Sequence, residues 1–216
     1  MPLYIESETE IPKDKPLPPA GTVDNVTISN VTAKANGGIF VTGFRESGGY
    51  IKRLTLDNVK IHMFGGKDKS ELNANPPDPY PIYGFHGAPY SMYFRYINSL
   101  QLRNVEFTWN TPEQADWGSV LRCESVNDLE VAGFNGRQSL GSEAPAIRLK
   151  KVASALVRNS RAPENTGTFI EIGSGVSKIA LLGNDLGEAR KTYSIAKGAS
   201  PNLFETGNRL PKDDLN

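Results

Sequence analysis

An eleven-residue pattern of hydrophobic and polar positions recurs six times along this chain of 216 residues. In each unit the first position is Val or Ile, the fourth and sixth are apolar, and the eighth is Asn or Gly. Apolar side chains two positions apart face the same side of a β-strand, so each unit predicts a strand with one buried face. Such a recurrence is typical of repeat proteins. The units begin at Val23, Ile51, Ile97, Val126, Val152 and Val176.

The eighth position of each unit predicts a sharp turn after the strand. Gly adopts a positive φ without steric penalty, and Asn adopts it more readily than most residues because its short amide bonds to the local backbone. We therefore expect left-handed backbone geometry at this position in every unit. The six residues are Asn30, Asn58, Asn104, Gly133, Asn159 and Gly183.

A second short strand is predicted before each unit. Most units begin about 20–30 residues after the start of the previous unit, which is the length of one solenoid coil. This arrangement predicts an all-β fold, a right-handed single-stranded parallel β-helix of about six to seven coils. The consensus and helices of leucine-rich repeats, the main alternative, are not visible, and only residues 185–195 could form a short turn of helix. The preceding strands are expected at 3–6, 39–43, 92–96, 120–124, 146–150 and 169–172.

The chain is expected to form one domain over residues 1–216. Residues 62–90 would insert a long loop rich in Pro and aromatic side chains, and residues 191–216 would form a C-terminal cap or tail. Solenoids usually cover their ends with polar caps, and no cap precedes the strand at 3–6. We therefore expect the C-terminal part of a longer β-helix, which self-associates through its uncapped N-terminal coil.

Composition narrows the choice of partners. The 24 basic and 24 acidic residues balance, which argues against nucleic acid or an anionic membrane surface as a partner. The single cysteine, Cys123, excludes an internal disulfide and is interpreted as a core residue. His62 and His86 have no clustered ligands nearby, so no metal or cofactor is expected. No signal peptide is visible and the compartment stays open, although a longer parent protein is expected to be secreted or periplasmic.

Four stretches of the chain resemble glycoside hydrolase family 28, the polygalacturonases and rhamnogalacturonases of pectin breakdown, and they do so in order and spacing. The resemblance covers most of the sequence. It implies a parallel β-helix that acts on an acidic plant polysaccharide without a cofactor. The stretches are Pro18–Ala33, Tyr80–Phe107, Pro145–Ile172 and Leu181–Arg190.

The catalytic signatures of that family do not appear in this sequence. It has no Asn-Thr-Asp triplet, its only Asp-Asp pair is Asp213-Asp214, and Phe85 precedes His86 where Gly-His-Gly would need Gly. Arg148-Leu149-Lys150 lies too late in the chain to be the family's Arg-Ile-Lys. No catalytic residue is carried over, and whether the chain is an enzyme on its own is left open.

The resemblance places the substrate along the outer face of the strands that precede the units. Arginine grips a sugar carboxylate in a bidentate way, and tyrosine stacks on sugar rings. An intramolecular charge ladder, in which Glu124 and Glu171 neutralise the arginines, explains the same pattern. The candidate contacts with an acidic polysaccharide are Tyr90, Tyr93, Arg95, Arg122, Glu124, Arg148 and His86.

Three functions are weighed on this basis. The first is the C-terminal β-helix portion of a pectin-type hydrolase, without catalytic carboxylates of its own. The second is a non-catalytic polysaccharide-binding or assembly module. The third, a lyase or tailspike type of β-helix, lacks the acidic cluster that Ca²⁺ would need. Independent hydrolysis would require two carboxylates, and Arg148 is expected to lie between Glu124 and Glu171 and to keep both ionised.

Overall fold

The computed structural model describes residues 3–6, 21–45, 49–64, 90–110 and 117–212. These residues form eleven strands in one sheet, every strand pairing is parallel, and no α-helix occurs among them. The expected all-β fold with parallel strands is confirmed. The strands are β1 Tyr4–Glu6, β2 Val26–Ala35, β3 Ile39–Thr42, β4 Ile51–Met63, β5 Met92–Trp109, β6 Leu121–Ala132, β7 Ile147–Arg158, β8 Thr166–Ile172, β9 Lys178–Leu182, β10 Ala189–Ile195 and β11 Asn202–Thr206.

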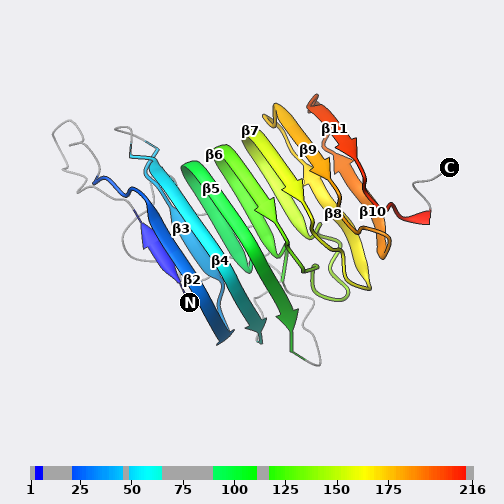
Figure 1. Ribbon diagram of the computed structural model, residues 1–216, viewed down its shortest axis with the longest axis horizontal. Helices are drawn as coiled ribbons and strands as arrows, with labels where there is room; N and C mark the ends of the chain where they lie inside the picture. Colours follow the sequence, from blue (N-terminus) through cyan, green and yellow to red (C-terminus); the bar gives the residue numbers. More distant parts are fainter. Residues whose placement is uncertain (1–2, 7–20, 46–48, 65–89, 111–116, 213–216) are drawn as a thin grey trace.

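Two rows of strands run along the molecule, and successive repeats lie side by side within each row (Figure 1). The first row contains β1, β3, the beginnings of β5, β6 and β7, and then β8 and β10. The second row contains β2, β4, the later parts of β5, β6 and β7, and then β9 and β11. The strands expected before each unit lie in the first row, and the units themselves lie in the second.

The strands β5, β6 and β7 belong to both rows because each bends at one residue with a positive φ. These residues are Tyr96 (φ 55°), Ser125 (φ 55°) and Lys151 (φ 51°). The sequence did not reveal these bends because none of the three is Gly or Asn, the residues that signal left-handed geometry.

The left-handed geometry expected at position eight is confirmed in all six units, although the strand continues beyond this residue at Asn30, Asn58 and Asn104. The φ angles lie between 49° at Asn159 and 69° at Gly133. At Gly133 packing adds a second reason for glycine, because a Cβ there would lie 2.8 Å from Asn104 Oδ1. Beyond position eight a third line of contacts runs along the stack. It begins with the paired ends of β2, β4 and β5 and continues through single parallel bridges. It joins Glu106, Asn135, Arg161, Asp185 and Arg209.

In-register pairing stacks the apolar positions of the units on top of one another. Leu54 pairs with Leu100, Leu100 with Leu129, and Leu129 with Ala155. All four side chains are buried in one continuous core that runs through the repeats. A buried leucine contributes about 1.5–3 kcal/mol, and a slip of one residue would turn the whole set toward solvent. The apolar pattern therefore fixes the register.

Two expectations from the sequence need correction. Residues 191–216 were expected to cap the fold or to form a tail, but β10 and β11 instead extend the first and second rows. Residues 185–195, the one segment that could have formed a short turn of helix, contain the strand β10 at residues 189–195 instead. Of the expected loop at 62–90, residues 65–89 lie outside the described residues. No helix in the described part of the chain is long or apolar enough to span a membrane.

Replacement of Asn58 by valine tests the role of position eight. Asn58 has a φ of 53°, and its Nδ2 donates to Asn30 Oδ1 over 2.8 Å. We expect Asn58→Val to lower the free energy of unfolding by about 1–2 kcal/mol, because a β-branched residue is strained at positive φ. Urea unfolding measures the change. Asn58→Gly is the control and should lose clearly less stability, because glycine adopts a positive φ without strain. Equal losses for both variants would show that the stability comes from the Asn58 hydrogen bond and not from the backbone conformation.

Candidate functional site

The outward side chains of the first row form two columns, which together we call the first-row face. Register partners in one column are Phe40, Tyr93, Arg122, Arg148 and Glu171. The neighbouring column contains Thr42, Arg95, Glu124 and Lys150. Because side chains alternate along a strand, the residues between them point into the core. The register brings these side chains into adjacent columns, and most of them are buried: Phe40, Thr42, Tyr93, Arg95 and Arg122.

Glu124 is the centre of the first-row face. Arg122 Nη2 donates to Glu124 Oε2 over 2.7 Å, and the Tyr93 hydroxyl donates to the same oxygen over 2.9 Å. The Nζ of Lys150 lies 2.9 Å from the other carboxylate oxygen. Arg122 also donates to the Tyr90 hydroxyl, and its guanidinium lies 4.7 Å from the ring centroids of both Tyr90 and Tyr93. Four candidate residues thus form one connected cluster.

This cluster holds Glu124 in its charged form. Burial alone would raise the pKa of Glu124, but the hydrogen bond from Lys150, the charge of Arg122 and the hydrogen bonds from Tyr93 and Arg122 lower it to about 2. Burial raises the pKa of Tyr93, so its hydroxyl stays protonated and donates to the carboxylate. Near neutral pH the cluster therefore contains one carboxylate between two cations, and Glu124 has no proton to give as an acid.

The remaining candidate arginines are also engaged. Arg148 Nε lies 2.9 Å from Glu171 Oε1, and Arg148 Nη2 donates to Glu171 Oε2. Arg95 is buried, and its Nε donates to Thr42 Oγ1 over 2.8 Å. Its guanidinium also lies 5.6 Å from the ring centroid of Phe40. The contacts are those of an intramolecular charge ladder. Of the sequence candidates, only His86 lies outside the described residues.

Other reactive groups of the described residues offer no catalytic arrangement. Cys123 is buried, and burial raises the pKa of its thiol, so the interpretation as a core residue is confirmed. No group of three or more His, Cys, Asp or Glu side chains in the described ranges could hold a metal ion. The described residues of the first-row face therefore present charged groups that pair with one another.

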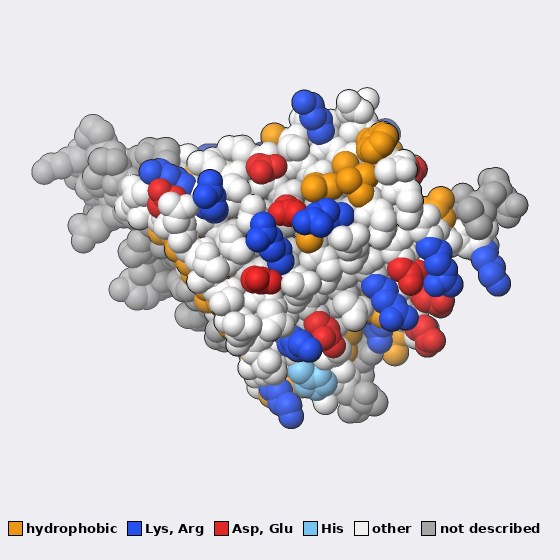
Figure 2. Space-filling model, in the orientation of Figure 1, with side chains coloured by type: hydrophobic (Ala, Val, Ile, Leu, Met, Phe, Trp, Pro, Cys, Tyr) orange, Lys and Arg blue, Asp and Glu red, His pale blue; other side chains and the backbone are white. Residues whose placement is uncertain are grey.

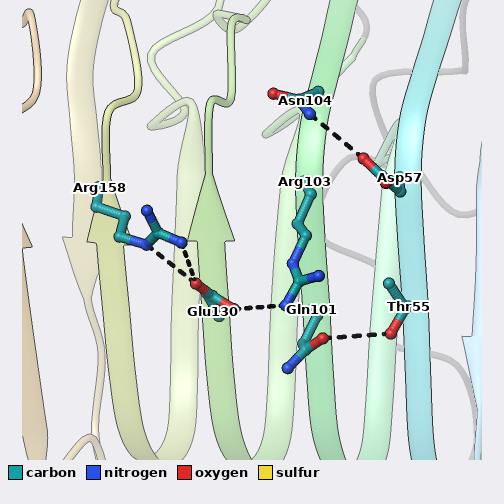
Figure 3. A network of polar contacts seen from close by, with 7 residues as sticks. All are labelled: Thr55, Asp57, Gln101, Arg103, Asn104, Glu130 and Arg158. Atoms are coloured by element: carbon teal, nitrogen blue, oxygen red, sulfur yellow. Dashed lines mark hydrogen bonds and ion pairs between the residues drawn. The ribbon is translucent and has the colours of Figure 1, made fainter.

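The second row carries a separate polar network (Figure 3). Glu130 accepts hydrogen bonds from Arg158 Nε and Nη2, and Arg103 Nη2 approaches its other oxygen at 3.5 Å. The hydrogen bond from Arg158 holds the pKa of Glu130 below its usual range. Figure 2 shows Lys and Arg side chains interspersed with Asp and Glu on the face turned to the viewer. That face has no patch of a single sign of charge.

A polar cleft lies beside the late strands of the first row, and the sequence did not reveal it. The main cleft has a volume of about 430 Å³ and adjoins a smaller one of about 220 Å³. Both lie between the segment 138–144 and the beginnings of β8 and β10. No repeat or motif marks this segment, so only the folded structure places it. The two clefts share three lining residues, Ser142, Glu143 and Arg190.

Comparisons with protein-family models, with curated proteins and with solved structures found no match to this chain.

The Glu124 cluster makes a pH-dependent stability prediction. A carboxylate whose folded pKa is lowered stabilises the fold above its unfolded pKa and loses that contribution as the pH falls through the folded value. We expect Glu124→Gln to destabilise the chain by about 2–3 kcal/mol at pH 7. This difference from the unmodified chain should shrink between pH 4.5 and about pH 2.

Chemical denaturation at several pH values measures that difference. Glu171→Gln is the matched control, because Glu171 contacts one arginine and its side chain is 31% exposed, against 14% for Glu124. A loss at Glu124 that is no larger than the loss at Glu171, or that does not change with pH, would contradict the proposed arrangement.

Proposed function

We propose that the chain folds as a right-handed parallel β-helix and serves as the glycan-binding portion of a pectin-type glycoside hydrolase. The fold part is supported by two strand rows in register, by the third line of bridges and by the left-handed turn in every repeat. The functional part adds the resemblance of four stretches to glycoside hydrolase family 28. The observation that carries it is the first-row face, where cations and tyrosines follow one another across adjacent strands.

The geometry favours binding over catalysis. A glycosidase needs one carboxylic acid that is protonated at its working pH, usually through a raised pKa. Glu124 has the opposite property, with a pKa of about 2. Glu171 is paired with Arg148. The described residues of the first-row face therefore suit a module that binds polysaccharide and does not cleave it.

Two residues of the face are accessible enough to meet a sugar carboxylate. The side chain of Arg148 is 26% exposed and that of Lys150 is 39% exposed, whereas Arg122 is only 5% exposed. A uronate carboxylate would compete with Glu171 for Arg148 and would use the free positions on the Lys150 ammonium. Adjacent strands lie about 4.8 Å apart, close to the length of one sugar unit, so a polymer can cross several strands. Arg122 and the tyrosines hold this surface in place from beneath.

Retention on immobilised polygalacturonate tests the proposal. We expect the 216-residue chain to be retained by this polymer, to be released by salt because the contacts are ionic, and to be retained less by methyl-esterified pectin. The double variant Arg148→Gln, Lys150→Gln should lose most of the retention. Lys52→Gln, which removes one exposed cation from the second row, is the control.

Two results would contradict the proposal. One is the absence of retention on polygalacturonate by the unmodified chain. The other is that the unmodified chain releases reducing ends from polygalacturonate and that Glu124→Gln or Glu171→Gln abolishes this activity. The chain would then be a catalyst in its own right.

We also propose that the chain self-associates through its N-terminal coil, as expected from the sequence. At the β2 end of the stack, Val26, Val31 and Ala33 are only half-buried against the core. Pairing of this edge with a second copy would cover those side chains. Sedimentation velocity should show a concentration-dependent dimer or larger species, and Val31→Lys should shift it toward monomer. A monomer at all concentrations would rule out association through this edge.

A further inference from the structure

We propose that the cleft beside β8 and β10 is a second, separate site that binds one carboxylated sugar unit through Arg190. The choice of a sugar as the ligand rests on the proposed function, whereas the anionic contact rests on the cleft alone. The main cleft is lined by Gln138, Leu140, Gly141, Ser142, Glu143, Asn165, Thr166, Glu188 and Arg190.

The cleft is built before any ligand arrives. Gln138 is buried and ties one wall to the floor, because its Nε2 donates to the Asn165 carbonyl over 2.9 Å. Its Oε1 accepts from the Gly167 backbone N–H over 3.2 Å. Ser142 Oγ accepts from the Ala144 N–H and shapes the opposite wall. A pocket fixed by its own hydrogen bonds lowers the entropic cost of binding.

Arg190 supplies a positive charge that forms no ion pair with a described side chain. Its guanidinium lies over Gly167, where a Cβ would come within 3.3 Å of Nη2. Within the described part of the chain, the side chain of Arg190 has no hydrogen bond or ion pair, whereas Arg122 and Arg148 each face a glutamate. A planar guanidinium in a polar cleft is suited to bidentate contact with a carboxylate.

The other side chains of the cleft select the kind of anion. Glu143 and Glu188 both line it, and two carboxylates beside the arginine disfavour a doubly charged phosphate or sulfate ester. They favour a ligand with one charge and several hydroxyl groups, because carboxylates accept hydrogen bonds from hydroxyls. Exposed Leu140 adds an apolar contact for the C–H face of a sugar ring. A volume of about 430 Å³ is within the range of small-molecule sites.

The cleft differs from the first-row face in one essential respect. On the first-row face a ligand must displace Glu171 from Arg148, while in the cleft Arg190 has no described carboxylate partner to displace. The smaller cleft also brings Lys191 near, so two cations balance the charge of the two glutamates. We therefore expect the cleft to bind a free monosaccharide uronate, which the first-row face binds weakly.

Calorimetric titration of the full chain with galacturonate tests this site. We expect saturable binding of galacturonate, no binding of galactose, and weaker binding of inorganic phosphate. Arg190→Gln should raise the Kd at least tenfold. Arg53→Gln is the control and should leave the Kd unchanged, because it removes an exposed arginine from β4, in an early repeat. Thermal unfolding of each variant checks that the fold is retained.

The outcomes separate this site from the proposed function. In one outcome the chain is retained by polygalacturonate while galacturonate does not bind, or binds equally well to Arg190→Gln. Either result would overturn the site and leave the proposed function standing. Galacturonate binding that depends on Arg190, without retention of the polymer, would support the site and overturn the proposed function. Phosphate that binds as tightly as galacturonate would overturn the assignment of a carboxylated sugar.

Discussion

The structure depends on one backbone constraint, a residue with positive φ at the same place in every repeat. At Asn30, Asn58 and Asn104 the strand changes direction at this residue and then continues for five more residues. The next repeat can then pair with the previous one in register, which stacks apolar side chains of equal position. Asparagine adds a lateral contact, since Asn58 donates to Asn30. Register, core and outward columns all follow from that regular turn.

The same register decides what the outward face can do. It places Arg122 beside Arg148, a repulsive neighbour, and the fold compensates with Glu124 and Glu171. Glu124 is thereby committed to the fold, and its pKa of about 2 removes it from acid catalysis. A charge that stabilises the stack is less available to a ligand. Arg190 has no such partner among the described residues, and this contrast distinguishes the charge ladder from the proposed binding cleft.

Much of the fold follows from the sequence, because strand alternation and the Asn or Gly turn are local signals. The bends at Tyr96 and Lys151 were missed, since neither residue type signals positive φ. The repeat that ends in β11 was also missed: Ser200 and Glu205 occupy positions that are apolar in the other units, although Gly207 keeps the turn with a φ of 68°. The site was predictable only in part. Alternation identified the outward residues, but burial of Arg95 and the cleft depend on how distant segments pack.

Disulfide trapping of register partners tests the stacked parallel arrangement most directly. Thr55 and Gln101 are 46 residues apart in sequence and face each other on adjacent strands, with their side chains 3.4 Å apart (Figure 3). Cysteines at facing positions of neighbouring strands are close enough to bridge, while a shift by two residues is not. The account predicts that Thr55→Cys with Gln101→Cys forms a bridge under mild oxidation, and that Thr55→Cys with Arg103→Cys does not. Equal bridging of both pairs, or bridging of the second pair alone, would contradict the register on which the fold and both sites depend.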